Sequence, residues 1–179
     1  MMREGLLSAL LDLPLISRVR RNHALEHATM QVLSEHHSNL RLMGRSSLWG
    51  FHIYGDASTE DVLNAAREGL RRLKAGEQAM AIHPNCGSNY VVAGTVAALS
   101  AFLALGGVSR SQRESLLDRL ARLPMACAMA TLGIILSRPL GTALQAHVTT
   151  EPDVGDLCIA SVTRNEQAGS AVHFVSTIG

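Results

Sequence analysis

The hydrophobic and polar positions divide the chain into three parts. In residues 1–89, apolar side chains recur every three or four positions or alternate, as in amphipathic helices and half-buried strands. Residues 90–140 are dominated by uncharged runs, and residues 141–179 return to short alternating runs. We therefore predict an α+β fold, a small mixed sheet with two or three helices, interrupted by a two-helix transmembrane hairpin in the middle part.

Strand-like patterns occur on both sides of the uncharged middle part. The predicted strands are residues 40–43, 50–55, 78–83, 156–163 and 171–177. Between the second and the third of them, a helix is predicted to begin after Ser58 as its N-cap and to stop at Gly76. Residues 40–83 would then form a ββαβ unit, and the last two strands a hairpin that joins the same sheet.

The N-terminal stretch predicts two helices. Residues 5–17 are apolar but short, which indicates an interfacial or packing helix rather than a signal peptide. The arginines within residues 18–21 would lie at lipid headgroups or form a solvated face. Asn22 is predicted to be the N-cap of a second helix, which runs to His36 or His37.

The uncharged runs indicate a membrane. Residues 90–108 are close to the ~20 residues that span a bilayer. Residues 123–137 are shorter but can be extended through Leu140 if the Arg138 side chain snorkels to the membrane surface. A buried helical hairpin in a globular protein is the alternative. Small residues four positions apart favour close helix packing in lipid. They are Gly94 with Ala98, Ala93 with Ala97, and Ala126 with Ala130.

Charge narrows the choice of partners. The net charge of +1 gives no case for a nucleic-acid-binding surface, and the uncharged runs make membrane lipid the predicted partner. The arginine-rich connection 109–121 would be cytoplasmic by the positive-inside rule, which places residues 1–89 on the other side. No export signal precedes those residues, which favours the opposite orientation. We expect an integral protein of the bacterial inner membrane, with its orientation and oligomeric state open.

Residues 21–29, Arg-Asn-His-Ala-Leu-Glu-His-Ala-Thr, carry the strongest chemical signal. His23, Glu26 and His27 lie within one helical turn and project from one face. Two imidazoles at this spacing can share a zinc ion, and the carboxylate beside the second can act as general base. The opposite side of the helix is apolar and would pack against the rest of the protein, which would leave the face with His23, Glu26 and His27 free for chemistry. The alternative is a surface helix with three polar residues on its wet side.

A second chemical stretch follows the third predicted strand. His83-Pro-Asn-Cys86-Gly-Ser-Asn places an imidazole and a thiol in one turn, where either can complete a metal site. An ordinary turn with a free thiol is the alternative, because the three cysteines have no CxxC spacing and indicate no disulfide framework. His147 and His173 are isolated and are expected to be structural or exposed, although either could be a ligand.

Two resemblances follow from these motifs. Residues 21–29 and 81–89, with Gly-Phe-His-Ile-Tyr-Gly at 50–55 and apolar segments after them, resemble an uncharacterised bacterial and plastid membrane-protein family, a domain of unknown function. The His-x-x-Glu-His order resembles the inverted-zincin, pitrilysin-like metallopeptidases. That resemblance implies zinc on the two histidines and Glu26 as base. No downstream glutamate here matches the third ligand of those enzymes, so His83 or Cys86 would replace it.

The sequence thus predicts a membrane-anchored zinc protein, a hydrolase acting on peptides. Zinc would lie on His23, His27 and either His83 or Cys86, with one position left for water and Glu26 beside it. Coordination by all four side chains would close the site and make it structural. The alternative is a non-catalytic integral-membrane subunit or interaction protein.

Overall fold

The chain folds into two units. The computed structural model describes residues 2–37, 39–107, 116–167 and 170–179. Unit 1 comprises the residues up to His83 together with Gln145–Gly179, and unit 2 comprises Pro84–Leu144.

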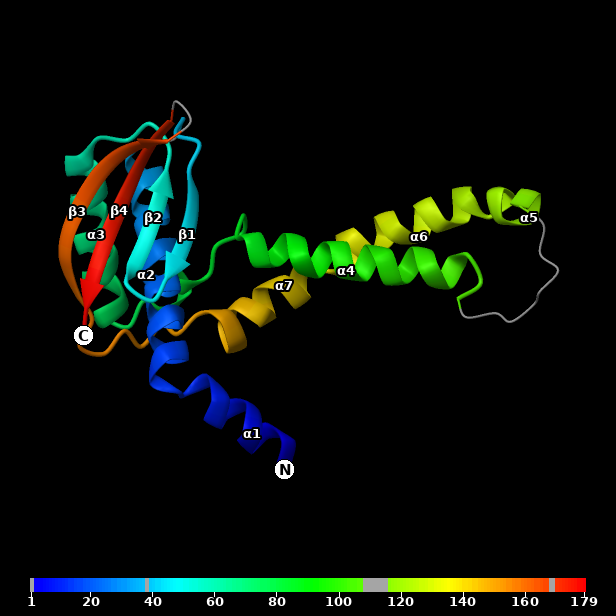
Figure 1. The fold of residues 1–179 in the computed structure, drawn as a ribbon, viewed down its shortest axis with the longest axis horizontal. Helices are drawn as coiled ribbons and strands as arrows, with labels where there is room; N and C mark the ends of the chain where they lie inside the picture. Colours follow the sequence, from blue (N-terminus) through cyan, green and yellow to red (C-terminus); the bar gives the residue numbers. More distant parts are fainter. Residues whose placement is uncertain (1, 38, 108–115, 168–169) are drawn as a thin grey trace. The chain divides into compact units, whose positions relative to one another are not determined.

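The sheet of unit 1 combines strands from both ends of the chain (Figure 1). The order is β1-β2-β4-β3, and every neighbouring pair is antiparallel, so the α+β class is confirmed but the prediction of a mixed sheet is wrong. The predicted C-terminal hairpin is present and joins the sheet through β4, where Val175 lies opposite Phe51 of β2. The strands are β1 Met43–Ser47, β2 Gly50–Tyr54, β3 Cys158–Gln167 and β4 Ser170–Ile178.

Two helices cover one face of this sheet (Figure 1). They are α2, Pro14–His36, and α3, Thr59–Lys74, and α1, Met2–Leu11, precedes them. The core between helices and sheet consists of aliphatic side chains and one phenylalanine, which drives the packing through apolar burial. Its fully buried members include Leu25, Phe51, Ile53, Val62 and Val175.

The start of α2 corrects the prediction for Asn22. The helix begins at Pro14, whose fixed φ suits the first helical turn, so Asn22 lies within it and is not an N-cap. The Asn22 side chain is fully buried, and its Nδ2 donates to Ser47 O at 2.9 Å. Its Oδ1 accepts from Thr177 Oγ1 at 2.7 Å. The amide therefore ties α2 to the β1–β2 turn and to β4.

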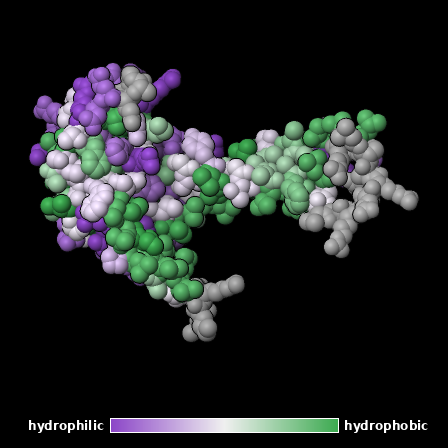
Figure 2. All heavy atoms as spheres, viewed as in Figure 1, coloured by the Kyte–Doolittle hydropathy of each residue, from purple (hydrophilic) through white to green (hydrophobic). Residues whose placement is uncertain are grey.

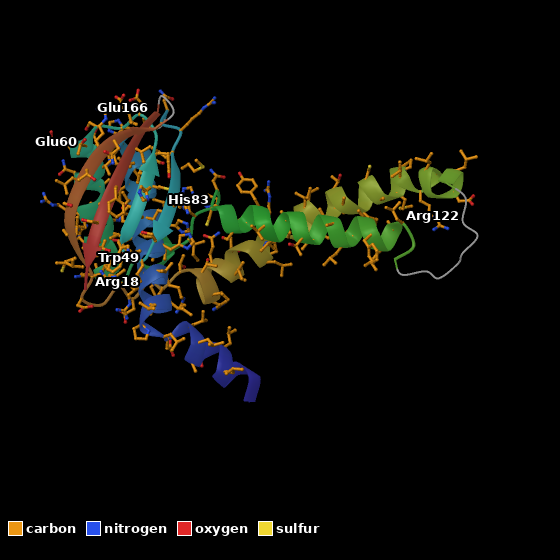
Figure 3. The ribbon with its side chains drawn as sticks, in the orientation of Figure 1. Arg18, Trp49, Glu60, His83, Arg122 and Glu166 are labelled. Atoms are coloured by element: carbon orange, nitrogen blue, oxygen red, sulfur yellow. The ribbon has the colours of Figure 1, made fainter. Side chains whose placement is uncertain are left out.

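The arginines before the first histidine also have partners within unit 1. Arg18 donates to Leu48 O and Thr177 O, both at 2.9 Å, and lies at the same end of the unit as Trp49 (Figure 3). Arg20 and Arg21 pair with Glu151 at 3.2 and 2.9 Å. Neither the headgroup interpretation nor the solvated-face interpretation foresaw these internal contacts.

The region between α2 and the end of α3 agrees only in part with its prediction. Ser58 is the N-cap of α3, since its Oγ accepts from Asp61 N at 3.0 Å, and Gly76 follows the helix with a φ of +92°. The first strand lies at Met43–Ser47 rather than at 40–43. The strand predicted at 78–83 is wrong. Gln78–Ala81 is a 3-10 helix, η1, and side chains of α2, rather than any strand in the part of the chain that the structure describes, bind the carbonyls of Met80 and Ala81.

Unit 2 is helical. Its elements are α4 Gly87–Ala104, α5 Leu116–Ala121, α6 Leu123–Leu136 and α7 Arg138–Leu144. Helix α4 packs against α6, and Gly133 lies at this contact, where a Cβ would lie 2.9 Å from Ser100 Oγ. A Cβ at Gly94 would meet nothing within 4 Å. The predicted role of Gly94 in helix packing is therefore wrong, because that residue lies on the outer face of α4.

One helix of unit 2, α4, is by itself a candidate membrane span. Within the described ranges, α4 alone is long and apolar enough to cross a membrane, and none of its 18 residues is buried. A second candidate passes only as a bent pair, Leu123–Leu136 with Arg138–Thr149, at 44°. The prediction of two continuous transmembrane helices is therefore wrong. The described part of the chain has one continuous candidate span, and a second only if the bent pair is counted as one span. Most of the predicted connection 109–121 lies outside the described residues.

Candidate metal centre

His23 and His27 are neighbours on α2, as their spacing predicted. Their ring centroids are 4.4 Å apart with the planes tilted by 60°, and a ring nitrogen of each lies within 4.8 Å of the other. His23 is half-buried and His27 is only 1% exposed. The prediction that this face is free for chemistry is wrong as regards exposure, because His27 is buried and both imidazoles bond to backbone carbonyls of unit 1.

Backbone carbonyls fix the tautomer of both rings. His23 Nδ1 lies 2.9 Å from Thr149 O, and His27 Nδ1 lies 2.7 Å from Ala81 O. A carbonyl oxygen only accepts, so each Nδ1 carries the hydrogen and each neutral ring has its lone pair on Nε2. This arrangement is typical of metal-binding histidines, where the hydrogen bond orients the ring and raises its basicity.

The Nε2 atom of His27 is a buried polar atom that has no hydrogen-bond partner among the described residues. An unsatisfied buried polar group costs roughly 1–3 kcal/mol, and such a group in a native structure calls for a missing partner. A metal ion would use this lone pair without requiring a proton. The donor chemistry therefore fits zinc, which accepts neutral imidazole nitrogen.

His83 is brought to the same place from a distant part of the sequence. Its ring centroid lies 5.7 Å from that of His27, and its backbone N donates to Gln145 Oε1 at 2.9 Å. His83 is the last residue of the first segment of unit 1, where the chain leaves that unit (Figure 3). The structure thus brings together three of the predicted site histidines.

Cys86 belongs to unit 2 and is described there. Cys86 is half-buried at the N-cap position of α4, and its Sγ accepts from Ser88 Oγ at 3.2 Å. Three peptide links separate it from His83, so the two Cα atoms are at most about 11 Å apart whatever the arrangement of the units.

Glu26 faces the sheet. Its side chain is 4% exposed and accepts a hydrogen bond from Ser46 Oγ of β1. Gly44, also on β1, packs directly against it, because a Cβ there would lie 2.8 Å from Glu26 Cγ and still closer to the carboxylate. The histidines instead contact η1 and η2, the π-helix Gln145–Thr149. The predicted base is thus near its histidines on the helix but is directed towards β1.

One polar residue of the site was not predicted. Gln31 lies one turn after His27, and its Nε2 donates to Met80 O at 2.9 Å and to Ile82 O at 3.0 Å. The signal was the spacing itself, since residues 23, 27 and 31 are four positions apart and share a face. It was missed because an amide side chain in a helix usually indicates only a solvated position.

The other candidate histidines are not part of this cluster. His147 is exposed in η2. His173 is fully buried on β4, where its Nε2 lies 3.3 Å from Thr59 Oγ1. Burial, with a smaller effect of the Arg164 charge, holds the pKa of His173 below its usual value of 6.5. A neutral histidine that joins β4 to α3 is a structural residue.

The comparisons with known proteins agree with the family resemblance of the motifs. Residues 18–162 match the model of the family described as "Domain of unknown function (DUF6391)". The chain belongs to this family. An uncharacterized protein of Picosynechococcus sp. is 32% identical over 167 residues, which cover 88% of this chain and 78% of that protein. No solved structure matches the chain significantly. The DUF6391 match includes both motifs and α4, and its description names no activity.

Proposed function

We propose that this DUF6391 protein is a membrane-anchored zinc-binding protein and a candidate metallohydrolase of the peptidase type. One observation carries the metal part of the proposal. Two histidines one helical turn apart both direct Nδ1 at a backbone carbonyl, and the Nε2 of one of them is buried without a partner. A surface helix with a polar face would leave its imidazoles in water instead.

His23 and His27 would supply two nitrogen ligands, and His83 or Cys86 the third. His83 is supported by its closeness to His27, and Cys86 by its short tether and by the preference of zinc for thiolate sulfur. Three protein ligands would leave a position for water, whereas all four would give a closed, structural site. The choice between them therefore decides whether hydrolysis is possible.

The chemistry of an open site would depend on Glu26. Zinc, when bound, lowers the pKa of a coordinated water and polarises a carbonyl group. Glu26 lies one residue before His27 and would accept the proton of that water and deliver it to the leaving amine of a peptide. Burial and the Ser46 hydroxyl hold the carboxylate in a fixed position, so this role requires it to turn from β1 towards the histidines.

The surface of unit 2 supports the membrane part of the proposal. Helix α4 has no charged residue and is unburied along its whole length, and α6 is also uncharged. Apolar side chains predominate on the face of these helices that Figure 2 shows. The exposed apolar side chains of the two helices include Val91, Leu99, Leu103, Leu132, Ile135 and Leu136, each more than half exposed. Such a surface is costly in water and suits lipid.

A non-catalytic role is the second candidate, and the contacts of Glu26 favour it. A carboxylate that accepts from Ser46 and packs against Gly44 is already used in holding α2 to β1. In that case the metal would stabilise the packing of α2 against η1 and η2, which carry Ala81 and Thr149. The protein would then be a metal-stabilised membrane subunit rather than an enzyme.

Metal content separates these possibilities. The full chain would be purified in detergent and its zinc measured by elemental analysis for the wild type, His23→Ala, His27→Ala, His83→Ala, Cys86→Ala and Glu26→Gln. The exposed His147→Ala is the matched control. We expect about one zinc per chain, lost in either helical variant and kept in Glu26→Gln and His147→Ala. Zinc that is absent from the wild type, or unaffected by His23 and His27, would refute the metal site.

A hydrolase assay follows only if zinc is found. Peptide cleavage by the wild type that is lost in Glu26→Gln, with zinc retained, would support the catalytic proposal. Zinc without cleavage, with zinc affinity reduced by His83→Ala and by Cys86→Ala alike, would instead support the closed structural site. Recovery of the wild type in the soluble fraction without detergent would contradict the membrane anchor.

A further inference from the structure

One face of α2 bonds to backbone carbonyls over two successive turns. His23 bonds to Thr149 O, His27 to Ala81 O, and Gln31 to both Met80 O and Ile82 O. Gln31 is not among the ligands proposed above. It nevertheless makes two of the hydrogen bonds that hold residues 80–82, directly before His83, against α2.

The carbonyls of this segment need such partners. The last carbonyl groups of a 3-10 helix have no N–H donor within the helix. Met80 and Ala81 are only 5% and 1% exposed, so water does not reach them freely. Side chains of α2 bind the carbonyls of residues 80, 81 and 82 in succession. The two bonds of Gln31 therefore flank the bond made by His27.

This arrangement links Gln31 to the proposed metal centre in two ways. Ala81 O accepts a hydrogen bond from His27 Nδ1 and so favours the tautomer whose lone pair is on Nε2. Movement of Ala81 would break this hydrogen bond, and the tautomer would no longer be fixed. His83 directly follows Ile82, and its place beside His27 depends on the path of the same backbone. Holding residues 80–82 therefore governs one ligand's orientation and another ligand's position.

We propose that Gln31 is a positioning residue of the metal centre, an inference that rests on the proposed function. Its amide nitrogen offers two hydrogens from one rigid planar group, which matches two carbonyls two residues apart. Methionine has a similar length but no donor. Glutamate has the same shape but would place acceptors against two carbonyl oxygens. Lysine keeps donors on a longer and more flexible chain, and so would restore part of the function.

The test measures cobalt(II) binding by the full chain in detergent. Cobalt(II) is the probe because its visible absorption reports the geometry of its ligands. For Gln31→Met we expect affinity to fall about 10–100-fold, as for other residues that orient metal ligands, together with a changed absorption spectrum. Gln31→Lys should bind within a few-fold of wild type with the wild-type spectrum. Gln78→Met is the matched control, because Gln78 is exposed in the same 3-10 helix.

The outcomes distinguish this inference from the proposed function. If the wild type binds no cobalt(II), the metal site itself is refuted. If the wild type binds and Gln31→Met has the same affinity and spectrum, only the positioning role is refuted. That role also fails if Gln31→Met and Gln31→Lys lower the metal-free melting temperature equally while both keep wild-type binding. Weakened binding with an altered spectrum in Gln31→Met alone supports it.

Discussion

Glu26 of α2 packs directly onto Gly44 of β1, with no space between them for a side chain. A Cβ at Gly44 would lie 2.8 Å from Glu26 Cγ, and Ser46 on the same strand donates to the Glu26 carboxylate. The close approach of strand and helix therefore depends on the absence of a side chain at Gly44. The same contact determines which way the predicted catalytic carboxylate points.

Gly44→Ala is expected to destabilise unit 1 by about 1–3 kcal/mol, because the new Cβ would overlap the buried Glu26 side chain and force it to shift away from β1. Denaturant unfolding in detergent, followed by the fluorescence of the single tryptophan, Trp49, would measure the change. Adding Glu26→Ala to Gly44→Ala should recover part of the loss, since the two effects share one contact.

Gly5→Ala is the control for this substitution. A Cβ at Gly5, in α1, would meet nothing within 4 Å, so the same change should leave stability within about 0.5 kcal/mol of wild type or raise it slightly. A Gly44→Ala protein as stable as the Gly5→Ala protein would show that β1 and α2 separate easily. The fixed direction of Glu26 would then be unsupported.

The buried amide of Asn22 gives a second prediction. Asn22→Ala removes the bonds to Ser47 O, Leu48 O and Thr177 Oγ1 and leaves these groups without that partner. We expect a loss of about 2–4 kcal/mol in the free energy of unfolding. Trp49 follows Leu48 directly, so its fluorescence reports this region. Asn64→Ala, at an exposed position of α3, is the control and should change stability by less than about 0.5 kcal/mol.

Local patterns in the sequence were sufficient for several elements. The four-residue spacing of His23 and His27 placed both imidazoles on one face of a helix, and Ser58 indicated the start of α3. The alternating apolar residues around Val175 indicated the C-terminal hairpin. Each of these features depends on neighbours within a few residues or on a simple period. They can therefore be read before any tertiary contact is known.

Other features depend on partners far along the chain, and these were not predicted. Asparagine is a residue type favoured at helix N-caps, but Ser47 and Thr177 provide buried hydrogen-bond partners for the Asn22 amide inside α2. Residues 78–83 alternate like a strand, yet Gln31 and His27 bind their carbonyls and no strand pairs with them among the described residues. Tertiary hydrogen bonds override local preference in both cases.

The buried His173 makes stability depend on pH. Its pKa is held below 6.5, mainly by burial, so the folded protein keeps the ring neutral while the unfolded chain can protonate it. Above about pH 6.5 the ring is neutral in both states. As the pH falls below that value, the unfolded state binds the proton first, and stability declines until the pH reaches the lowered folded pKa.

His173→Gln should therefore flatten the dependence of unfolding free energy on pH between about 7.5 and 5. The difference in slope should stay below the ~1.4 kcal/mol per pH unit that one proton can contribute. The measurement would use a chelator, so that release of metal does not add to the slope. His147→Gln replaces an exposed histidine and should leave the slope as in wild type. Equal slopes in all three proteins would mean that protonation of His173 is not linked to unfolding.

The contact between Gly133 and Ser100 gives a prediction for unit 2. A Cβ at Gly133 would lie 2.9 Å from Ser100 Oγ and 3.3 Å from Val96 Cγ1, whereas one at Gly94 would lie in open space. Gly133→Leu should force α4 and α6 apart, and Gly94→Leu should leave their packing intact. Limited proteolysis in detergent would detect the difference, because separated helices expose backbone to cleavage. Rapid cleavage within residues 84–144 is expected for Gly133→Leu only. If both variants resist protease like the wild type, α4 and α6 do not depend on close contact at Gly133.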